Sequence, residues 1–139
     1  MLTSIHFILT YRCTSECEHC FVYGSPNAIE TFTVEQLRTV FREIDKIPTI
    51  ESIYFEGGEP FLYYPLLLEG TRLAQERHLN IGIVSNSYWA IDEVSAELWL
   101  QPLVNMGLSE LGISDDAFHN SKDTESLSQF AIKAAKTLG

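Results

Sequence analysis

Three cysteines near the start of the chain are the residues best suited to carry chemistry. Cys13, Cys17 and Cys20 lie within eight residues of one another, separated by three and then two residues, and the sequence has no other cysteine. An odd and tightly clustered set argues against a disulfide framework. Clustered thiolates are typical ligands of a metal ion or an iron–sulfur cluster. We therefore expect this segment to bind one of the two.

The number of thiolates bears on which group is bound. A closed zinc site needs a fourth ligand, and His19 between Glu18 and Cys20 is the nearest further donor. A cubane [4Fe–4S] cluster held by three cysteines leaves one iron without a protein ligand, which an incoming molecule can bind. Zinc binding and the packing of buried thiols both remain alternatives on the spacing alone.

Four strand patterns alternate with four helix patterns and must position the cysteines. Strands are expected at residues 4–9, 51–55, 81–85 and 110–114, where apolar residues run or alternate. Such alternation is typical of a parallel sheet with right-handed crossovers. The fold class expected is therefore α/β, with four consecutive βα units of a partial (β/α) barrel.

Capping and breaking residues set the expected bounds of the helices. Thr33 and Gln36 form a capping box for the first helix, and Pro48 ends it. The second helix is expected at 66–76, entered at Pro65. Asp92 caps the third, which Pro102 is expected to interrupt. A last helix is expected after Thr124, with one apolar stripe: Leu127, Phe130, Ala131, Ala134, Ala135 and Leu138.

Residues suited to binding follow each of the expected strands. The carboxyl ends of parallel strands meet at one edge of a sheet, where the chemistry of such folds gathers. Four candidate segments should therefore converge on one pocket: the cysteine segment, Gly57–Pro60, Ser85–Ser87 and Ser114–Asp116.

Composition excludes several other classes of protein. A chain of 139 residues that is 45% apolar and 12% aromatic is one folded domain rather than a disordered chain. No apolar run approaches the roughly 18 residues of a membrane span, and no basic segment precedes an apolar one as in a secretory signal. Nine Lys and Arg face nineteen Asp and Glu, and this net charge of −10 argues against nucleic-acid binding. We expect a cytoplasmic location.

The cysteine segment directly after a first strand resembles that of the radical S-adenosylmethionine (SAM) superfamily. In that family the residue before the last cysteine is aromatic in type, and here it is His19. The resemblance runs almost the whole chain in order, and its further elements are the GGEP-like run Gly57-Gly58-Glu59-Pro60, Asn86 in a short turn, and Ser114-Asp115-Asp116 as a Ser-x-Asp strand ending.

This resemblance implies a set of ligands for each element. The three cysteines would hold a [4Fe–4S] cluster, whose open iron would bind the amino and carboxylate groups of SAM. The backbone of Gly57, Gly58 and Pro60, together with Glu59, would meet the SAM ammonium. The remaining contacts implied are His19 against adenine, Asn86 at the cofactor, and Ser114 and Asp116 at the ribose or carboxylate.

It also implies an enzymatic activity. A reduced cluster, supplied by an external electron donor, would cleave the C5′–S bond of SAM, and the 5′-deoxyadenosyl radical would take hydrogen from a substrate. A general similarity of the segments around Trp89 and Phe118-His119 to peptide-maturing members suggests a peptide as this substrate. The competing hypotheses are a non-catalytic iron–sulfur or SAM-binding module and a zinc-stabilised α/β scaffold.

Several of these residues have ordinary structural interpretations as well. Gly57–Pro60 taken alone is typical of a turn at a strand end, Asn86 of a turn residue, and Asp116 of a residue near a helix start. Trp89 and Trp99 are expected to pack in the interior. The three remaining histidines lack metal-ligand spacing and are expected to be structural or exposed: His6, His78 and His119.

The chain departs from the family in length. Family members have six βα units, whereas residues 1–139 hold the first four of one radical SAM core domain. We therefore expect a truncated barrel whose fourth strand has an unpaired edge. Unpaired edges invite pairing, so this side should either support self-association or be covered by the last helix.

Overall fold

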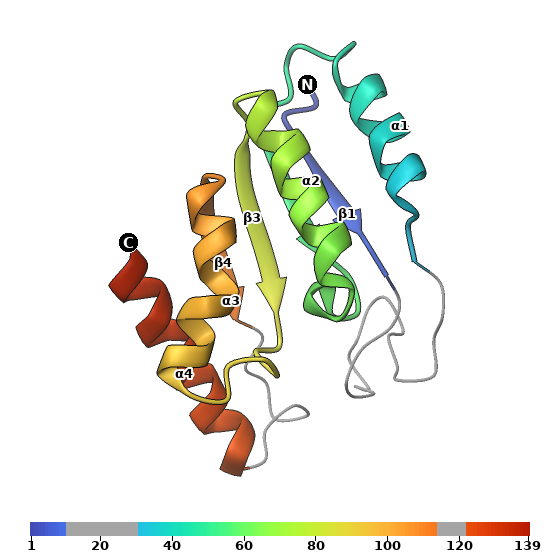
Figure 1. Ribbon diagram of the computed structural model, residues 1–139. Coiled ribbons are helices and arrows are strands. Elements are labelled where there is room, and N and C mark those ends of the chain that lie inside the picture. The colour runs from blue at the N-terminus through green and yellow to red at the C-terminus, as the bar shows by residue number, and fades with distance from the viewer. Residues whose placement is uncertain (11–30, 114–121) are drawn as a thin grey trace.

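The computed structural model describes residues 1–10, 31–113 and 122–139, and these form one four-stranded sheet with helices packed against it (Figure 1). The strands are β1 (Ser4–Ile8), β2 (Ser52–Glu56), β3 (Asn80–Ser85) and β4 (Leu108–Ile113). All three pairings are parallel and the strand order is β1-β2-β3-β4. The expected parallel sheet of consecutive βα units is confirmed, and the sheet does not close into a full barrel.

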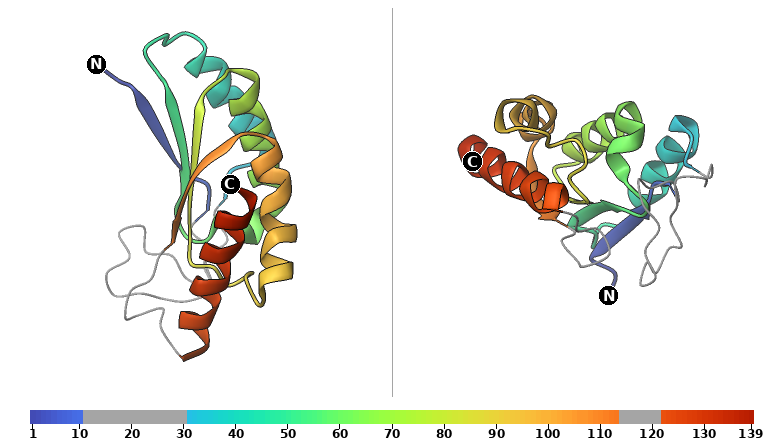
Figure 2. Two further views of the ribbon diagram at one scale, coloured as in Figure 1. Left: turned by 90° about the vertical axis from the view of Figure 1, so that its left-hand side faces the viewer. Right: turned by 90° about the horizontal axis from the view of Figure 1, so that it is seen from below.

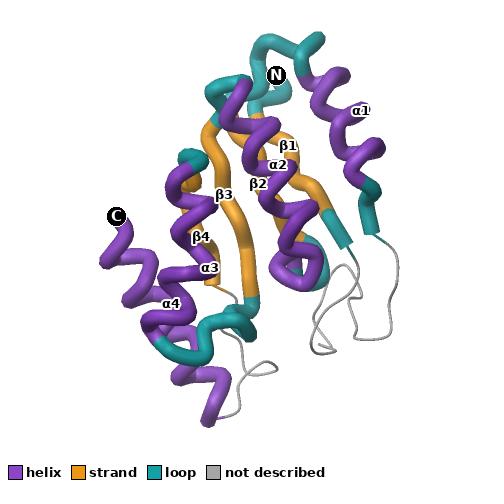
Figure 3. The backbone as a smooth tube through the Cα atoms, in the orientation of Figure 1, coloured by secondary structure: helices purple, strands orange, loops and turns teal. Residues whose placement is uncertain are grey.

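The helices alternate with the strands along the chain. They are α1 (Val34–Ile44), α2 (Tyr64–Glu76), α3 (Glu93–Asn105) and α4 (Lys122–Leu138), and a short 3-10 helix, η1 (Pro60–Tyr63), precedes α2. Figure 2 shows that they lie on one side of the sheet, and within the described residues no helix covers its other face. Figure 3 shows the same arrangement as a layer of helices in front of the strands.

The two faces of the sheet differ in residue type because side chains alternate along a strand. The helix-covered face carries Phe7, Ile53, Phe55, Ile81 and Ile83, all of them buried. Phe7 stacks on Phe41 of α1 at a centroid distance of 5.3 Å and packs on Phe55 at 5.5 Å. The core therefore lies between sheet and helices, and the uncovered face is left for other contacts.

Two expected helix starts are confirmed by their side-chain hydrogen bonds. Thr33 Oγ1 accepts from the Gln36 backbone N–H (3.1 Å), and Gln36 Oε1 accepts from the Thr33 N–H (2.9 Å), which completes the capping box. Asp92 Oδ1 accepts from the Ser95 N–H (2.7 Å) at the start of α3. The bonds satisfy backbone donors that the first turn of a helix leaves unpaired.

Two expectations about helix bounds are wrong. Pro102 lies inside α3, which continues to Asn105. Pro102 leaves the Leu98 carbonyl without its usual helical partner, and Ala96, Leu100 and Leu103 on the other side of the helix are buried in the core. Thr124 does not cap α4, because the helix already begins at Lys122. Its buried Ala131 and Ala134 belong to the expected stripe.

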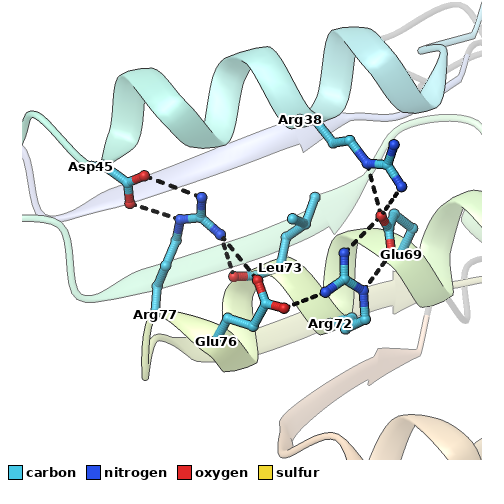
Figure 4. Close-up of polar contacts among 7 residues, drawn as sticks. All are labelled: Arg38, Asp45, Glu69, Arg72, Leu73, Glu76 and Arg77. Carbon is cyan, nitrogen blue, oxygen red and sulfur yellow. Dashed lines mark hydrogen bonds and ion pairs between the residues drawn. The ribbon is translucent and has the colours of Figure 1, made fainter.

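Charged residues join α1 to α2 over the covered face (Figure 4). Glu69 of α2 accepts from Arg38 Nη2 of α1 (2.8 Å) and from Arg72 Nε on its own helix (2.6 Å). The hydrogen bond from Arg72, with a further one from Arg38, lowers the pKa of Glu69 to about 2. Arg77 pairs with Asp45 just beyond α1 (2.7 Å). These pairs link α1 to α2 across their shared interface.

The outer edge of β4 has no strand beside it within the three described ranges. Helix α4 packs mainly on α3 and also contacts β4. It lies at the β4 end of the helical layer (Figure 2). Self-association through this edge stays a prediction. No helix in the part of the chain that the structure describes is long and apolar enough to cross a membrane.

Candidate SAM-binding site

The Gly57–Pro60 turn lies at the carboxyl end of β2, directly beside the end of β1. Gly57 and Gly58 have φ angles of 81° and 54°, a region that favours glycine. A Cβ on Gly57 would lie 2.3 Å from Ile8 Cγ2 and 2.9 Å from Ile8 Cα. The turn can approach β1 this closely only because residue 57 has no side chain. It is therefore held next to the strand that leads into the cysteine segment.

Glu59 is fully buried within this turn, and both of its carboxylate oxygens accept hydrogen bonds from the protein. The Phe61 backbone N–H donates to Oε2 (3.0 Å), and the Asn86 backbone N–H donates to Oε1 (2.6 Å). The Ser85 hydroxyl donates as well, at 3.0 Å from Oε2 and 3.1 Å from Oε1. One carboxylate thus joins the turn after β2 to the turn after β3.

Ser85 extends this connection to the start of the next loop. Its Oγ accepts from the Ser87 backbone N–H (3.1 Å) and from Trp89 Nε1 (2.8 Å). Since two N–H groups point at this oxygen, its own hydrogen is directed to Glu59. Trp89 in turn stacks on Phe61 at 4.4 Å. The buried position of Trp89 confirms that it is a packing residue.

The turn after β3 is held by its own side chains too. Asn86 Oδ1 accepts from the Tyr88 backbone N–H (3.0 Å), the turn geometry expected of asparagine here. Ser87 has a φ angle of 67°, which is uncommon for a residue other than glycine. Its Oγ is buried and has no hydrogen-bond partner among the described residues. Strain and an unsatisfied hydroxyl are features that gather at ligand-binding turns.

Burial raises the pKa of Glu59 from 4.5 to about 7, against the lowering effect of its hydrogen bonds from Asn86, Phe61 and Ser85. The native state therefore binds a proton between about pH 4.5 and pH 7 that the unfolded state has released. Stability contributed by this group is largest at acid pH and falls as pH rises through 7, by up to about 3 kcal/mol.

This predicts a specific change on replacing Glu59 with Gln. The free energy of unfolding of the wild-type chain should fall between pH 5 and pH 8 relative to that of the Glu59→Gln variant, which cannot titrate at this position. Urea unfolding of both proteins across that range measures the difference. Parallel pH profiles for the two proteins would show that Glu59 does not titrate as its burial requires.

The structure brings together only some of the residues expected from the sequence. Gly57, Gly58, Glu59 and Pro60 lie next to Asn86 through the bonds to Glu59. The remaining ones fall outside the described residues: Cys13, Cys17, Cys20, His19, Ser114 and Asp116. Within the described ranges no group of His, Cys, Asp or Glu is arranged to hold a metal ion.

The described residues that flank them in the chain lie at one edge of the sheet. Thr10 comes three positions before Cys13 and follows β1, and Ile113 at the end of β4 comes directly before Ser114. Because all four strands are parallel, these points and the two turns lie at the carboxyl edge of one sheet.

A cluster on the uncovered face was missed by the sequence analysis. His6 Nδ1 lies 3.0 Å from Glu56 Oε1, and the His6 ring stacks on Tyr54 at 4.7 Å. A Cβ on Gly82 would meet the Tyr54 ring at 2.5 Å, so glycine there makes room for the ring. Strand alternation could have revealed the cluster, because His6, Tyr54 and Glu56 all alternate with buried apolar residues.

Comparison with known proteins agrees with these features. The family model of the radical SAM superfamily matches residues 7–136. The chain belongs to the radical SAM superfamily. The same match covers the cysteine segment, the Gly57–Pro60 turn and all of β2, β3 and β4.

The chain also matches individual relatives, and each match covers only about a third of the relative's own length. A Bacillus subtilis (strain 168) protein named for peptide biosynthesis, YydG, is 30% identical over 111 residues, which is 80% of this chain and 35% of that protein. A Methanocaldococcus jannaschii protein named as a glycyl-radical enzyme activating enzyme, MJ1632, is 27% identical over 85 residues, or 61% of this chain and 32% of its own.

A third relative is named for a different reaction. The S-adenosylmethionine-dependent nucleotide dehydratase of Fibrobacter sp. (strain UWH6) is 25% identical over 122 residues, covering 82% of this chain and 34% of the relative. The chain thus spans about a third of the length of each of these relatives.

Proposed function

We propose that this chain is the part of a radical SAM enzyme that binds both the [4Fe–4S] cluster and SAM, within one core domain spanning residues 1–139. Cys13, Cys17 and Cys20 would ligate the cluster. SAM would be bound by the backbone of the Gly57–Pro60 turn and by Asn86, with the other expected contacts made by His19, Ser114 and Asp116. The observation that carries the proposal is the close approach of Gly57 to Ile8, which supports a shared site for the GGEP-like turn and the cysteine segment.

The residues present are suited to these two ligands. Three thiolates match a cubane cluster that keeps one iron open. Two consecutive glycines at positive φ expose backbone groups that a ligand can approach closely. The buried Ser87 hydroxyl, which lacks a partner among the described residues, lies in the adjoining turn.

A [4Fe–4S] cluster held by Cys13, Cys17 and Cys20 would supply the electron for reductive cleavage of SAM, and this cleavage would provide the radical chemistry that acts on a substrate. The chain's own residues then have three tasks. The cysteines would fix the cluster, the two turns would orient SAM, and the open sheet face would leave room for a substrate. An external electron donor would reduce the cluster.

We further propose that the substrate is a peptide and that it lies against the uncovered face of the sheet. The name of YydG refers to peptide biosynthesis, which supports this class. On that face the paired His6 and Glu56 and the ring of Tyr54 offer hydrogen bonds and an aromatic surface. Glu56 comes immediately before Gly57, so the group formed by His6, Tyr54 and Glu56 adjoins the proposed SAM site.

Metal analysis tests this proposal against the zinc scaffold. Protein purified without oxygen should be brown and contain about four iron and four sulfide per chain, as one cubane site requires. Loss of the cluster should weaken SAM binding at least about tenfold, since the open iron contributes to the affinity. A colourless protein with one zinc per chain would identify the scaffold instead. Equal SAM affinity with and without the cluster would contradict the proposed geometry.

A further inference from the structure

Glu59 and three other residues form a closed ring of contacts that joins two distant parts of the chain. Glu59 accepts from the Phe61 backbone and from the Ser85 hydroxyl, Ser85 accepts from the Trp89 indole, and Trp89 stacks on Phe61. The side chains of Glu59, Phe61, Ser85 and Trp89 are at most 2% exposed. The ring therefore lies in the interior of the protein, beneath the two turns that it joins.

The donors in this ring leave Glu59 little freedom to reach a ligand itself. The Phe61 and Asn86 N–H groups and the Ser85 hydroxyl already occupy both carboxylate oxygens. Turning the carboxylate outward would leave these buried donors without partners, which costs more than such bonds contribute when made. Tyr88 is the nearby titratable side chain, and its hydroxyl donates to the Phe61 carbonyl (3.0 Å) rather than to Glu59.

We propose that Glu59 is a positioning residue for SAM: it locks the Gly57–Pro60 turn to the Ser85–Ser87 turn from behind, so that the backbone groups of both turns are held in one geometry for the ligand. This inference rests on the proposed function. It replaces a direct contact between Glu59 and the SAM ammonium by an indirect one, and it gives Ser85 and Trp89 a part in SAM binding although both are buried.

The two possibilities differ in what they predict for Trp89. If Glu59 contacts SAM directly, the indole N–H of Trp89 has no part in the affinity. If Glu59 acts by locking the turns, removal of that N–H frees the Ser85 hydroxyl to turn away, and the lock weakens. Trp89→Phe removes the N–H and keeps an aromatic ring to stack on Phe61.

Trp99→Phe is the matched control. Trp99 packs edge-on against Phe61 at 5.9 Å and against Tyr64 at 4.9 Å, so its replacement also removes one indole from the same aromatic cluster. Within the described residues its indole N–H bonds to neither turn. The two variants therefore share a packing defect and differ in the bond to Ser85.

The experiment measures SAM affinity by calorimetry in cluster-loaded wild-type, Trp89→Phe and Trp99→Phe chains, with urea unfolding of each. Trp89→Phe should raise the Kd for SAM about fivefold, as expected for one buried hydrogen bond, and Trp99→Phe should change it less than about twofold. In the NMR spectrum of the wild-type chain, SAM binding should shift the indole N–H resonance of Trp89 and leave that of Trp99 unchanged.

Each outcome separates the two proposals. Wild-type SAM binding that Trp89→Phe leaves unchanged would overturn the positioning role and leave the proposed function intact. Equal losses of affinity in both variants, together with equal losses of stability, would show that the ring is only structural. That result would also overturn the positioning role. A loaded wild-type chain that does not bind SAM would contradict the proposed function itself.

Discussion

Replacing Gly57 with alanine is expected to destabilise the protein strongly and to remove its affinity for SAM. The positive φ angle of this residue costs an L-amino acid roughly 1–2 kcal/mol. The added Cβ would also press on Ile8, whose Cα lies 2.9 Å away and belongs to the backbone of β1, so the strand or the turn must shift. Overpacking of this kind costs about 1–3 kcal/mol, which brings the expected loss of stability to about 3 kcal/mol.

Gly107 provides the control for this prediction. It has a similar φ angle of 94°, and no atom lies within 4 Å of the Cβ that alanine would add. Gly107→Ala should therefore show the backbone cost alone and retain SAM affinity. Urea unfolding and SAM calorimetry of both variants measure the difference. Equal effects of the two substitutions would show that the contact between the turn and β1 is unimportant.

The arrangement of strands was predictable because each one carries its own periodicity. In β2, Ile53 and Phe55 are buried and alternate with partly exposed residues, whereas β3 carries a run of three buried residues, Ile81 to Ile83. Caps at Thr33 and Asp92 are local as well, since each depends on residues three positions apart. Parallel order then follows from strand and helix alternation.

Features that depend on tertiary contacts were not predictable in the same way. The sequence singles out Glu59 but does not show that its oxygens accept from Ser85 and Asn86, 26 and 27 positions away. The sequence also does not show that helix α3 continues through Pro102. The helix continues because its tertiary packing outweighs the local cost of a proline inside it. Strand alternation places His6 on the uncovered face, but it does not show that its partner is Glu56, fifty positions further on.

The second large effect concerns the cysteine segment. Cys17→Ala should abolish the cluster, because two thiolates cannot replace three around one cubane site. The brown colour should disappear, and with it the cluster-dependent part of SAM binding. Ser15→Ala, which changes a non-ligating residue of the same segment, should retain both.

Formation of 5′-deoxyadenosine is the most direct test of the proposed radical SAM activity. Cluster-loaded wild-type protein, reduced with dithionite in the presence of SAM, should release 5′-deoxyadenosine and methionine in equal amounts, and Ser15→Ala should do the same. The Cys17→Ala variant should release neither. A wild-type protein that holds a reduced [4Fe–4S] cluster and binds SAM, yet forms no 5′-deoxyadenosine, would contradict the proposed enzyme and identify a non-catalytic binding module.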